Sequence, residues 1–178
     1  MSSAPQYLPH YTVSDYQHWE GHWELWNGVA IAMTPSPFGR HSKVVAKLIY
    51  ELIGSVEAAG CQATVLTEID WIVNDNTVVR PDVVVVCGNE PEQHIQSPPA
   101  VVVEVLSPGT ALRDRGPKRA LYSDHGVKHY LIVEPEERSF ALHSRNSDGQ
   151  LELVATPSVS LKICDDCELN IDVPKALS

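Results

Sequence analysis

The sequence predicts an α/β fold in which two principal helices flank a mixed, mostly antiparallel sheet. The first observation is a stripe of apolar residues at helical spacing between Val44 and Val56. The second is a pair of β-branched runs, Val78–Cys87 and Ala100–Leu106, bounded by proline, glycine and polar residues. The third is the length of 178 residues with 43% hydrophobic residues, which suits a single domain with a buried core.

The N-terminal third is predicted to contain a short helix, a hairpin and the long helix. The short helix covers Thr12 to Trp19. The dipeptide Asn27-Gly28 marks the hairpin, because both residues accept the positive φ of a type I′ turn. The long helix is expected to end near Gly60, since glycine suits the left-handed position that follows a helix. The hairpin strands are expected at His22–Trp26 and Val29–Met33.

The middle of the chain is predicted to be β. Gln62–Leu66 and Ile69–Val73 form one strand or a bent pair, followed by a turn at 74–76. The runs at 78–87 and 100–106 are predicted as buried strands, because their apolar residues continue without alternation.

A second helix and further strands complete the predicted fold. Gly116-Pro117 is expected to open this helix, because proline fits the first helical turn, and His125-Gly126 ends it after Asp124. The tail from Ser158 to Val173 is expected to be strand-like. Like the N-terminal hairpin, it is an addition to the core. Three strands are predicted between the helix and the tail, at Lys128–Glu134, Ser139–His143 and Gln150–Ala155.

Composition and charge exclude several classes of protein. Thirteen Lys and Arg residues against 23 Asp and Glu give a net charge of −10, which does not suit bulk attraction to nucleic acid or anionic membrane. No apolar segment approaches the ~20 residues of a membrane span, and the N-terminus lacks the pattern of a signal peptide. We therefore expect one cytoplasmic domain over residues 1–178, with flexible ends at 1–10 and 174–178.

The four cysteines are too few and too unevenly placed to predict a secreted disulfide framework. Cys164 and Cys167 form a C-x-x-C pair. A zinc site would need two more ligands, which only Cys61, Cys87 or a histidine could supply. We therefore do not expect zinc binding by this pair. We do not expect redox chemistry either, because no βαβ pattern surrounds the pair.

A carboxylate inside an apolar strand is the first sign of chemistry. Glu104 interrupts the run 101–106, and its burial is costly unless it is paired, protonated or bound to a metal. Asp82 opens the preceding run directly after Pro81. If the two strands pair, the carboxylates converge, and Mg²⁺ could bind them together with water and phosphate oxygens. A salt bridge from Glu104 to lysine or arginine is the structural alternative.

Five short motifs occur in one order between about Tyr11 and Pro135. They are His41-x-x-Val44-x-x-x-Leu48, Arg80-Pro81-Asp82, Val102-Val103-Glu104-Val105-Leu106-Ser107-Pro108, Asp114-Arg115-x-x-Lys118-x-x-x-Tyr122, and Gly126-Val127-x-x-Tyr130 with Pro135. This series resembles the Uma family of bacterial endonucleases, a branch of the PD-(D/E)XK restriction-endonuclease-like superfamily. The resemblance implies a restriction-endonuclease-like core and a nucleic-acid substrate, with DNA favoured over RNA.

The resemblance also implies roles for individual residues. Asp82 and Glu104 would bind one or two Mg²⁺ or Mn²⁺ ions, together with the backbone carbonyl of Val105. The lysine that the superfamily has two residues after the glutamate is Leu106 here, which cannot serve. The family pattern suggests that Lys118 replaces it as the catalytic lysine; a solvated surface lysine is the alternative.

Four further residues complete the candidate site: His41 as a catalytic candidate, and Tyr122, Glu24 and Arg115 as accessory candidates. Tyr122 lies one helical turn after the proposed lysine and shares its face. His41 begins the buried stripe of the long helix and either faces the site or has a packing role. Glu24 aligns with an acidic position of the family, although an ordinary polar strand residue is the simpler interpretation. Arg115 belongs to a basic run at 113–119 that, with Arg40, Lys43 and Lys47, would form an anion site if these cations cluster.

The leading hypothesis is therefore a Mg²⁺-dependent endonuclease that acts on nucleic acid. One alternative is a catalytically inactive relative that binds nucleic acid or a protein partner, and the absent E-x-K lysine and the charge of −10 favour it. Another is a regulatory oligomer in which Glu104 is simply paired to Lys118. We also expect a homodimer, because Trp19, Trp23 and Trp26 are candidates for an exposed aromatic cluster.

Overall fold

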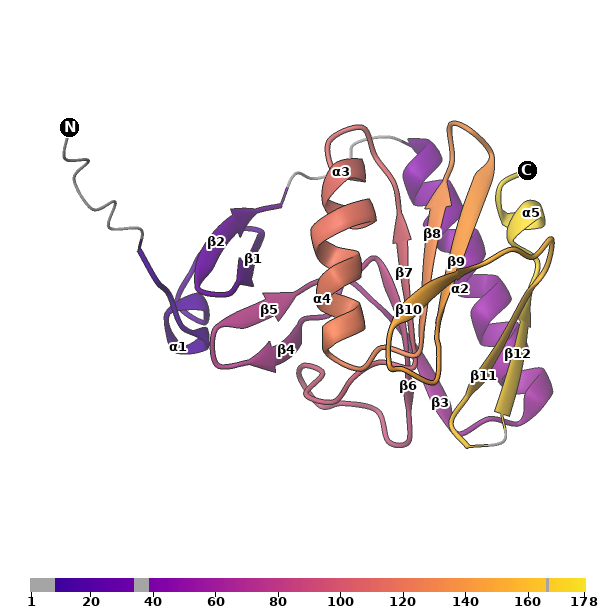
Figure 1. Ribbon diagram of the computed structural model, residues 1–178, viewed down its shortest axis with the longest axis horizontal. Coiled ribbons are helices and arrows are strands. Elements are labelled where there is room, and N and C mark those ends of the chain that lie inside the picture. Colours follow the sequence, from indigo (N-terminus) through magenta and orange to yellow (C-terminus); the bar gives the residue numbers. More distant parts are fainter. Residues whose placement is uncertain (1–8, 34–38, 166) are drawn as a thin grey trace.

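The computed structural model describes residues 9–33, 39–165 and 167–178. Its centre is a six-stranded sheet in the order β10-β9-β8-β7-β6-β3 (Figure 1). Every neighbouring pair is antiparallel except β7 and β8, so the predicted mixed, mostly antiparallel sheet is confirmed. The strands are β3 (Ala63–Thr67), β6 (Val83–Cys87), β7 (Val101–Val105), β8 (His129–Glu134), β9 (Ser139–Arg145) and β10 (Leu151–Val154).

The long helix α2 (Gly39–Ala59) covers one face of this sheet, and the helical segment that carries α4 covers the other (Figure 1). Valines 101, 103 and 105 of β7 face α2, in a cluster with Leu48 and Leu52. Because side chains alternate along a strand, Val102 faces the opposite layer, and so does Glu104. The alternation of β7 therefore directs the one carboxylate of the strand toward α4.

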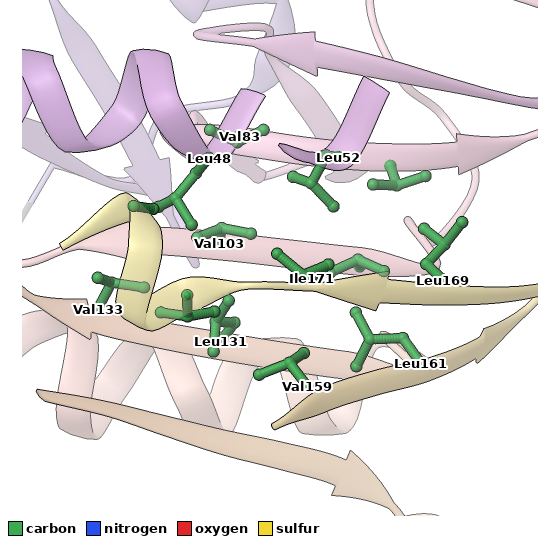
Figure 2. Packing of buried hydrophobic residues seen from close by; sticks show 14 of the residues in the cluster. Leu48, Leu52, Val83, Val103, Leu131, Val133, Val159, Leu161, Leu169 and Ile171 are labelled. Atoms are coloured by element: carbon green, nitrogen blue, oxygen red, sulfur yellow. The ribbon is translucent and has the colours of Figure 1, made fainter. Parts of the chain in front are cut away.

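The core between α2 and the sheet is closed by a C-terminal hairpin. Leu161, Leu169 and Ile171 of this hairpin meet Leu48 and Val103 (Figure 2). Burying each leucine side chain contributes about 1.5–3 kcal/mol. The hairpin consists of β11 (Val159–Ile163) and β12 (Cys167–Ile171), which form a separate two-stranded sheet followed by α5 (Val173–Ala176).

The C-terminal segment differs from the expected flexible end. Residues 173–176 form α5, and its Ala176 and the following Leu177 are buried. The side chain of Asp172 accepts a hydrogen bond from the Lys175 N–H and caps the helix. No helix among the described residues is long and apolar enough to cross a membrane.

A smaller four-stranded sheet, in the order β2-β1-β5-β4, lies beside the N-terminal helix α1 (Figure 1). The Asn27-Gly28 turn is confirmed, with φ of 47° and 82°, and Thr12 caps α1 through a capping box. The elements are α1 (Val13–Tyr16), β1 (Trp23–Trp26), β2 (Val29–Ala32), β4 (Trp71–Asn74) and β5 (Thr77–Val79).

Two strand predictions are corrected by this second sheet. The run 78–87 is not one strand: β5 ends at Val79, and β6 begins at Val83 in the central sheet. Proline at position 81 has no N–H for a strand ladder, so the chain leaves one sheet there and enters the other. In the same way, β3 and β4 are separate strands of different sheets rather than a bent pair.

The second helix begins earlier than Gly116-Pro117. It starts as α3 (Ala111–Arg113), continues through the π-helical turn η1 (Asp114–Lys118) and ends as α4 (Arg119–Asp124). Pro117 lies inside this helical segment. A proline cannot donate the i→i−4 hydrogen bond and crowds the carbonyl four residues before it, and the wider π turn accommodates both effects. Lys118 is consequently a residue of the helix interior and not of its first turn.

The three tryptophans that favour a homodimer are not freely exposed. Trp19, Trp23 and Trp26 are half-buried. The Trp19 ring makes edge contacts with Tyr11, Tyr16 and Trp23 at centroid separations of 5.0, 5.5 and 6.0 Å. The ring contacts of Trp19 and Trp23 lie within the chain, and the homodimer stays a prediction.

All four cysteines are paired in disulfides, contrary to expectation. Cys61 is bonded to Cys167 and Cys87 to Cys164. The partners are 106 and 77 residues apart in the sequence. Their pairing depends on the packing of the hairpin β11-β12 beside β3 and β6, and spacing along the chain gives no sign of it.

Candidate functional site

Two carboxylates from adjacent strands open onto one cavity. Asp82 directly precedes β6, and Glu104 lies in β7; the two strands pair in a register that sets Val83 opposite Val103. Both residues line a cavity of about 280 Å³, together with His41, Val105, Lys118 and other residues of the neighbouring loops. The predicted convergence of Asp82 and Glu104 is therefore found.

One oxygen of the Asp82 carboxylate is held by the protein. Oδ2 accepts a hydrogen bond of 2.7 Å from the backbone N–H of Val105 and lies 3.3 Å from Nε2 of His41. Among the described residues, none donates to Oδ1. The hydrogen bond to Asp82 raises the pKa of His41, an effect that partial burial opposes. His41 therefore faces the site, as one of its two interpretations predicts.

Glu104 is held in the same one-sided way. Its Oε1 accepts hydrogen bonds from the Tyr122 hydroxyl at 2.7 Å and from Nζ of Lys118 at 2.8 Å. Within the described part of the chain, no group donates to Oε2. Tyr122 is itself fixed by stacking on Trp71 and by an edge contact with Tyr130. Each carboxylate thus has one oxygen that accepts hydrogen bonds from the protein and one that accepts none from the residues in 9–33, 39–165 and 167–178.

Lys118 is a buried cation surrounded by carboxylates, and not the solvated lysine of the alternative interpretation. Its side chain is 8% exposed. Nζ lies 2.8 Å from Glu104, 3.1 Å from Glu24 and 3.8 Å from Asp114. Burial alone would lower the pKa of Lys118, but the three surrounding carboxylates raise it. The lysine is therefore charged and positionally fixed.

Glu24 is a constituent of the site and not an ordinary strand residue. It is 2% exposed, although it belongs to the small sheet. Its Oε1 accepts the Arg80 backbone N–H at 2.8 Å, and its Oε2 accepts Nε1 of Trp26 at 3.1 Å. Lys118 Nζ also contacts Oε1, so both carboxylate oxygens of Glu24 have protein partners. Its role is to hold the lysine.

The site carries more negative charge than its cations offset. Burial, together with the nearby Asp82, Asp114 and Glu24, raises the pKa of Glu104 to about 8, even though Lys118 acts in the opposite direction. Burial likewise raises the pKa of Asp114. A proton or an additional cation is therefore required to stabilise the cluster near neutral pH.

The donor set fits a magnesium-type ion better than a metal held by many side chains. No group of three or more His, Cys, Asp or Glu residues in the described ranges is arranged to hold a metal. Mg²⁺ commonly binds through one or two carboxylates and otherwise keeps water or phosphate oxygens. The two unoccupied oxygens of Asp82 and Glu104 meet that requirement.

Arg115 and three basic residues of α2 do not line the cavity. Arg115 pairs with Glu134 at 2.6 Å and is about half exposed, so it is not part of the cavity wall. The basic residues do not gather as one anion site: Arg40 pairs with Glu136, and Lys43 and Lys47 bind the C-terminal Ser178. Arg80 and Asp114, which the sequence analysis names only within motifs, and Arg113, which it names only within the basic run, also line the cavity. Glu68 lines it as well, and nothing in the sequence pattern indicated it.

The fold described above is shared with a solved protein structure. The architecture matches a solved structure from Anabaena variabilis ATCC 29413, described as "a putative nuclease belonging to DUF820", with a TM-score of 0.72. The match covers 94% of this chain and 99% of that chain at 17% identity, and it confirms the predicted fold class.

Sequence comparison then identifies the family. The family Uma2, described as "Putative restriction endonuclease", matches residues 13–174. The chain belongs to this family. It is also 30% identical over 154 residues to the uncharacterized protein slr1290 of Synechocystis sp. (strain ATCC 27184 / PCC 6803 / Kazusa), covering 83% of this chain and 80% of that protein.

Proposed function

We propose that this protein is a divalent-metal-dependent endonuclease that hydrolyses phosphodiester bonds in DNA. One observation carries the proposal: Asp82 and Glu104 line a single cavity, and each presents one carboxylate oxygen to which no described residue donates a hydrogen bond. The excess of negative charge in the cavity favours the binding of a divalent cation there. Family membership supports the same class of activity.

Asp82 and Glu104 would hold Mg²⁺ or Mn²⁺, with the carbonyl of Val105 as a further candidate ligand. A bound ion would polarise the scissile phosphate and lower the pKa of an attacking water. His41 and the Val105 N–H both hold Oδ2 of Asp82, and this orients Oδ1 for the ion. Tyr122 orients Glu104 in the same manner.

Lys118 supplies the positive charge that the superfamily places two residues after the glutamate. Leu106 occupies that position and is buried in the apolar layer beneath α4, so it has no polar role. Lys118 reaches the same carboxylate from the helix, at 2.8 Å from Oε1. A fixed ammonium beside the phosphate would stabilise charge that develops during hydrolysis or orient the attacking water.

A plasmid cleavage assay tests the proposal. Wild type should nick or linearise supercoiled DNA with Mg²⁺ or Mn²⁺ and not with EDTA, and Asp82→Asn and Glu104→Gln should each lose at least about 10²-fold in rate. Glu92→Gln, at an exposed carboxylate away from the cavity, is the matched control and should keep full activity. Single-stranded DNA and RNA should be offered beside the plasmid to define the substrate. Metal-independent cleavage, or cleavage that survives both substitutions, would refute the assignment.

A catalytically inactive metal- or nucleic-acid-binding relative is the second candidate. The observation in its favour is the buried ion pair of Glu104 and Lys118, which stabilises the cluster without any chemistry. This alternative predicts no cleavage by wild type on any of the three substrates, with nucleic-acid binding retained.

A further inference from the structure

The four cysteines meet at one corner of the fold, far from each other in the sequence. Cys61 lies between α2 and β3, and Cys87 is the last residue of β6. Cys164 and Cys167 flank the turn between β11 and β12. The Cα atoms are 5.8 Å apart for Cys61 and Cys167, and 5.5 Å apart for Cys87 and Cys164.

The two disulfides lie side by side rather than at separate places. Cys87 lies opposite Ala63 in the β3–β6 register, and Ala63 is two residues after Cys61. The Gly88 N–H also donates a hydrogen bond of 2.9 Å to the Gln62 carbonyl. In the hairpin β11-β12, the Cys167 N–H donates a hydrogen bond of 3.2 Å to the Cys164 carbonyl. The backbones of all four cysteines therefore lie at one corner of the fold, and this group of residues is called the cysteine cluster below.

This cluster supplies the two ligands that a C-x-x-C pair lacks on its own. Structural zinc sites are tetrahedral and commonly use four thiolates, two of them from a C-x-x-C turn. In the oxidised state the sulfurs are consumed by disulfides, so no described residue group is available to a metal here. We propose that, when reduced, Cys61, Cys87, Cys164 and Cys167 bind one structural Zn²⁺ ion.

The proposed conversion balances in two steps. In the first step the S–S bond of each disulfide breaks and two thiols form, while either a dithiol is oxidised to its own disulfide or a phosphine takes the oxygen of one water molecule to become the phosphine oxide. The four thiols then release four protons as their sulfurs bind one Zn²⁺. Cys87 is exposed, while the other three cysteines are partly buried against the apolar core, so reagents can reach the cluster from the Cys87 side.

A tether at this corner has a structural purpose in either redox state. The hairpin β11-β12 covers the core with Leu161 and Leu169, but it pairs with no strand of the central sheet. The cysteine cluster joins its turn to the edge of that sheet at β3 and β6. Zinc would preserve this joint under reducing conditions, in which disulfides do not persist.

Cobalt binding tests the proposal with a readout specific to sulfur ligands. The full chain is reduced with a phosphine, freed of metal and titrated with Co²⁺. We expect one equivalent to produce thiolate-to-cobalt charge-transfer absorption and the visible bands of a tetrahedral ion, and Zn²⁺ to displace it. Zinc should also raise the Tm of the reduced wild type by roughly 5–10 °C when free metal exceeds Kd about a hundredfold.

Variants separate this cluster from the carboxylate cavity. Cys87→Ser should abolish the tetrahedral tetrathiolate spectrum, and its fold can be checked by circular dichroism in the oxidised state, where Cys61–Cys167 remains. Asp82→Ala should retain the spectrum, because its carboxylate lies in the other site. A reduced wild type without thiolate absorption would overturn the proposal, and so would a spectrum that Cys87→Ser leaves unchanged.

Discussion

Replacement of Lys118 by methionine removes a cation that contacts three carboxylates of the buried cluster. The side chain is 8% exposed, so Glu104, at 2.8 Å, would lose its partner inside the protein. Breaking a buried pair by removing one member costs about 3–5 kcal/mol. For a chain of this size, that corresponds to a fall in Tm of roughly 6–20 °C.

The cost should depend on pH, and its sign follows from Glu104. Folding raises the pKa of Glu104 from 4.5 to about 8. Between pH 4.5 and pH 8, the folded protein therefore keeps a proton on Glu104 that the unfolded protein has released. Stability from this group is therefore complete at low pH and decreases as pH rises toward 8. Without Lys118 the pKa of Glu104 rises further, and the deficit of Lys118→Met should be larger at pH 9 than at pH 6.

Urea unfolding of wild type and variant at both pH values measures this difference, with Lys128→Met as the control at an exposed lysine. We expect the control to change stability by less than about 0.5 kcal/mol. Adding Glu104→Gln to Lys118→Met should recover at least about 1 kcal/mol at pH 9, because the unpaired charge is removed. A deficit below about 1 kcal/mol at pH 9, or one independent of pH, would refute Lys118 as the compensating charge.

Three further predictions concern the same cavity. By NMR, the pKa of His41 should lie above 6.5 in wild type and should fall in Asp82→Asn. The stability that the protonated His41 contributes is therefore complete below pH 6.5 and is lost as the pH rises through the raised pKa. A His41 pKa that Asp82→Asn leaves unchanged would contradict the ion pair of His41 and Asp82. Tyr122→Phe should cost about 1.5–3 kcal/mol in urea unfolding, since it removes a hydrogen bond of 2.7 Å to a carboxylate; a loss under about 0.5 kcal/mol would count against that bond. Mg²⁺ should raise the Tm of wild type more at pH 9 than at pH 6.5, because the ion must displace the proton of Glu104. It should not raise the Tm of Asp82→Ala. Equal shifts in Tm at both pH values would argue against Mg²⁺ binding at Glu104.

The residues of the site were predictable where one strand or one turn determines their position. Glu104 stands out because a carboxylate in a valine run needs a partner, and alternation along β7 then sets its direction. Asp82 follows from its place before the next buried strand. Lys118 and its distance to Glu104 agree with the interpretation, but the family resemblance, and not the local pattern, pointed to that lysine.

The features that sequence reasoning missed depend on contacts between distant segments. Glu24 was a candidate through the family resemblance alone, because nothing near position 24 indicates its burial or its contact with Lys118, which comes from the helical segment. Proline favours the first turn of a helix, which predicts a start at Gly116-Pro117, but a π turn admits Pro117 inside the helix. The disulfide partners likewise come from elements more than 70 residues apart.

The most direct test of the central claim is a crystal of wild type grown with Mn²⁺ and measured for anomalous scattering. Our account predicts a peak in the cavity bound by the carboxylate oxygens of Asp82 and Glu104, at the roughly 2.0–2.2 Å typical of small divalent ions with oxygen ligands. The peak should be absent in Asp82→Ala. An empty cavity in wild type at saturating Mn²⁺, with Lys118 still on Glu104, would contradict the metal site and leave a purely structural ion pair.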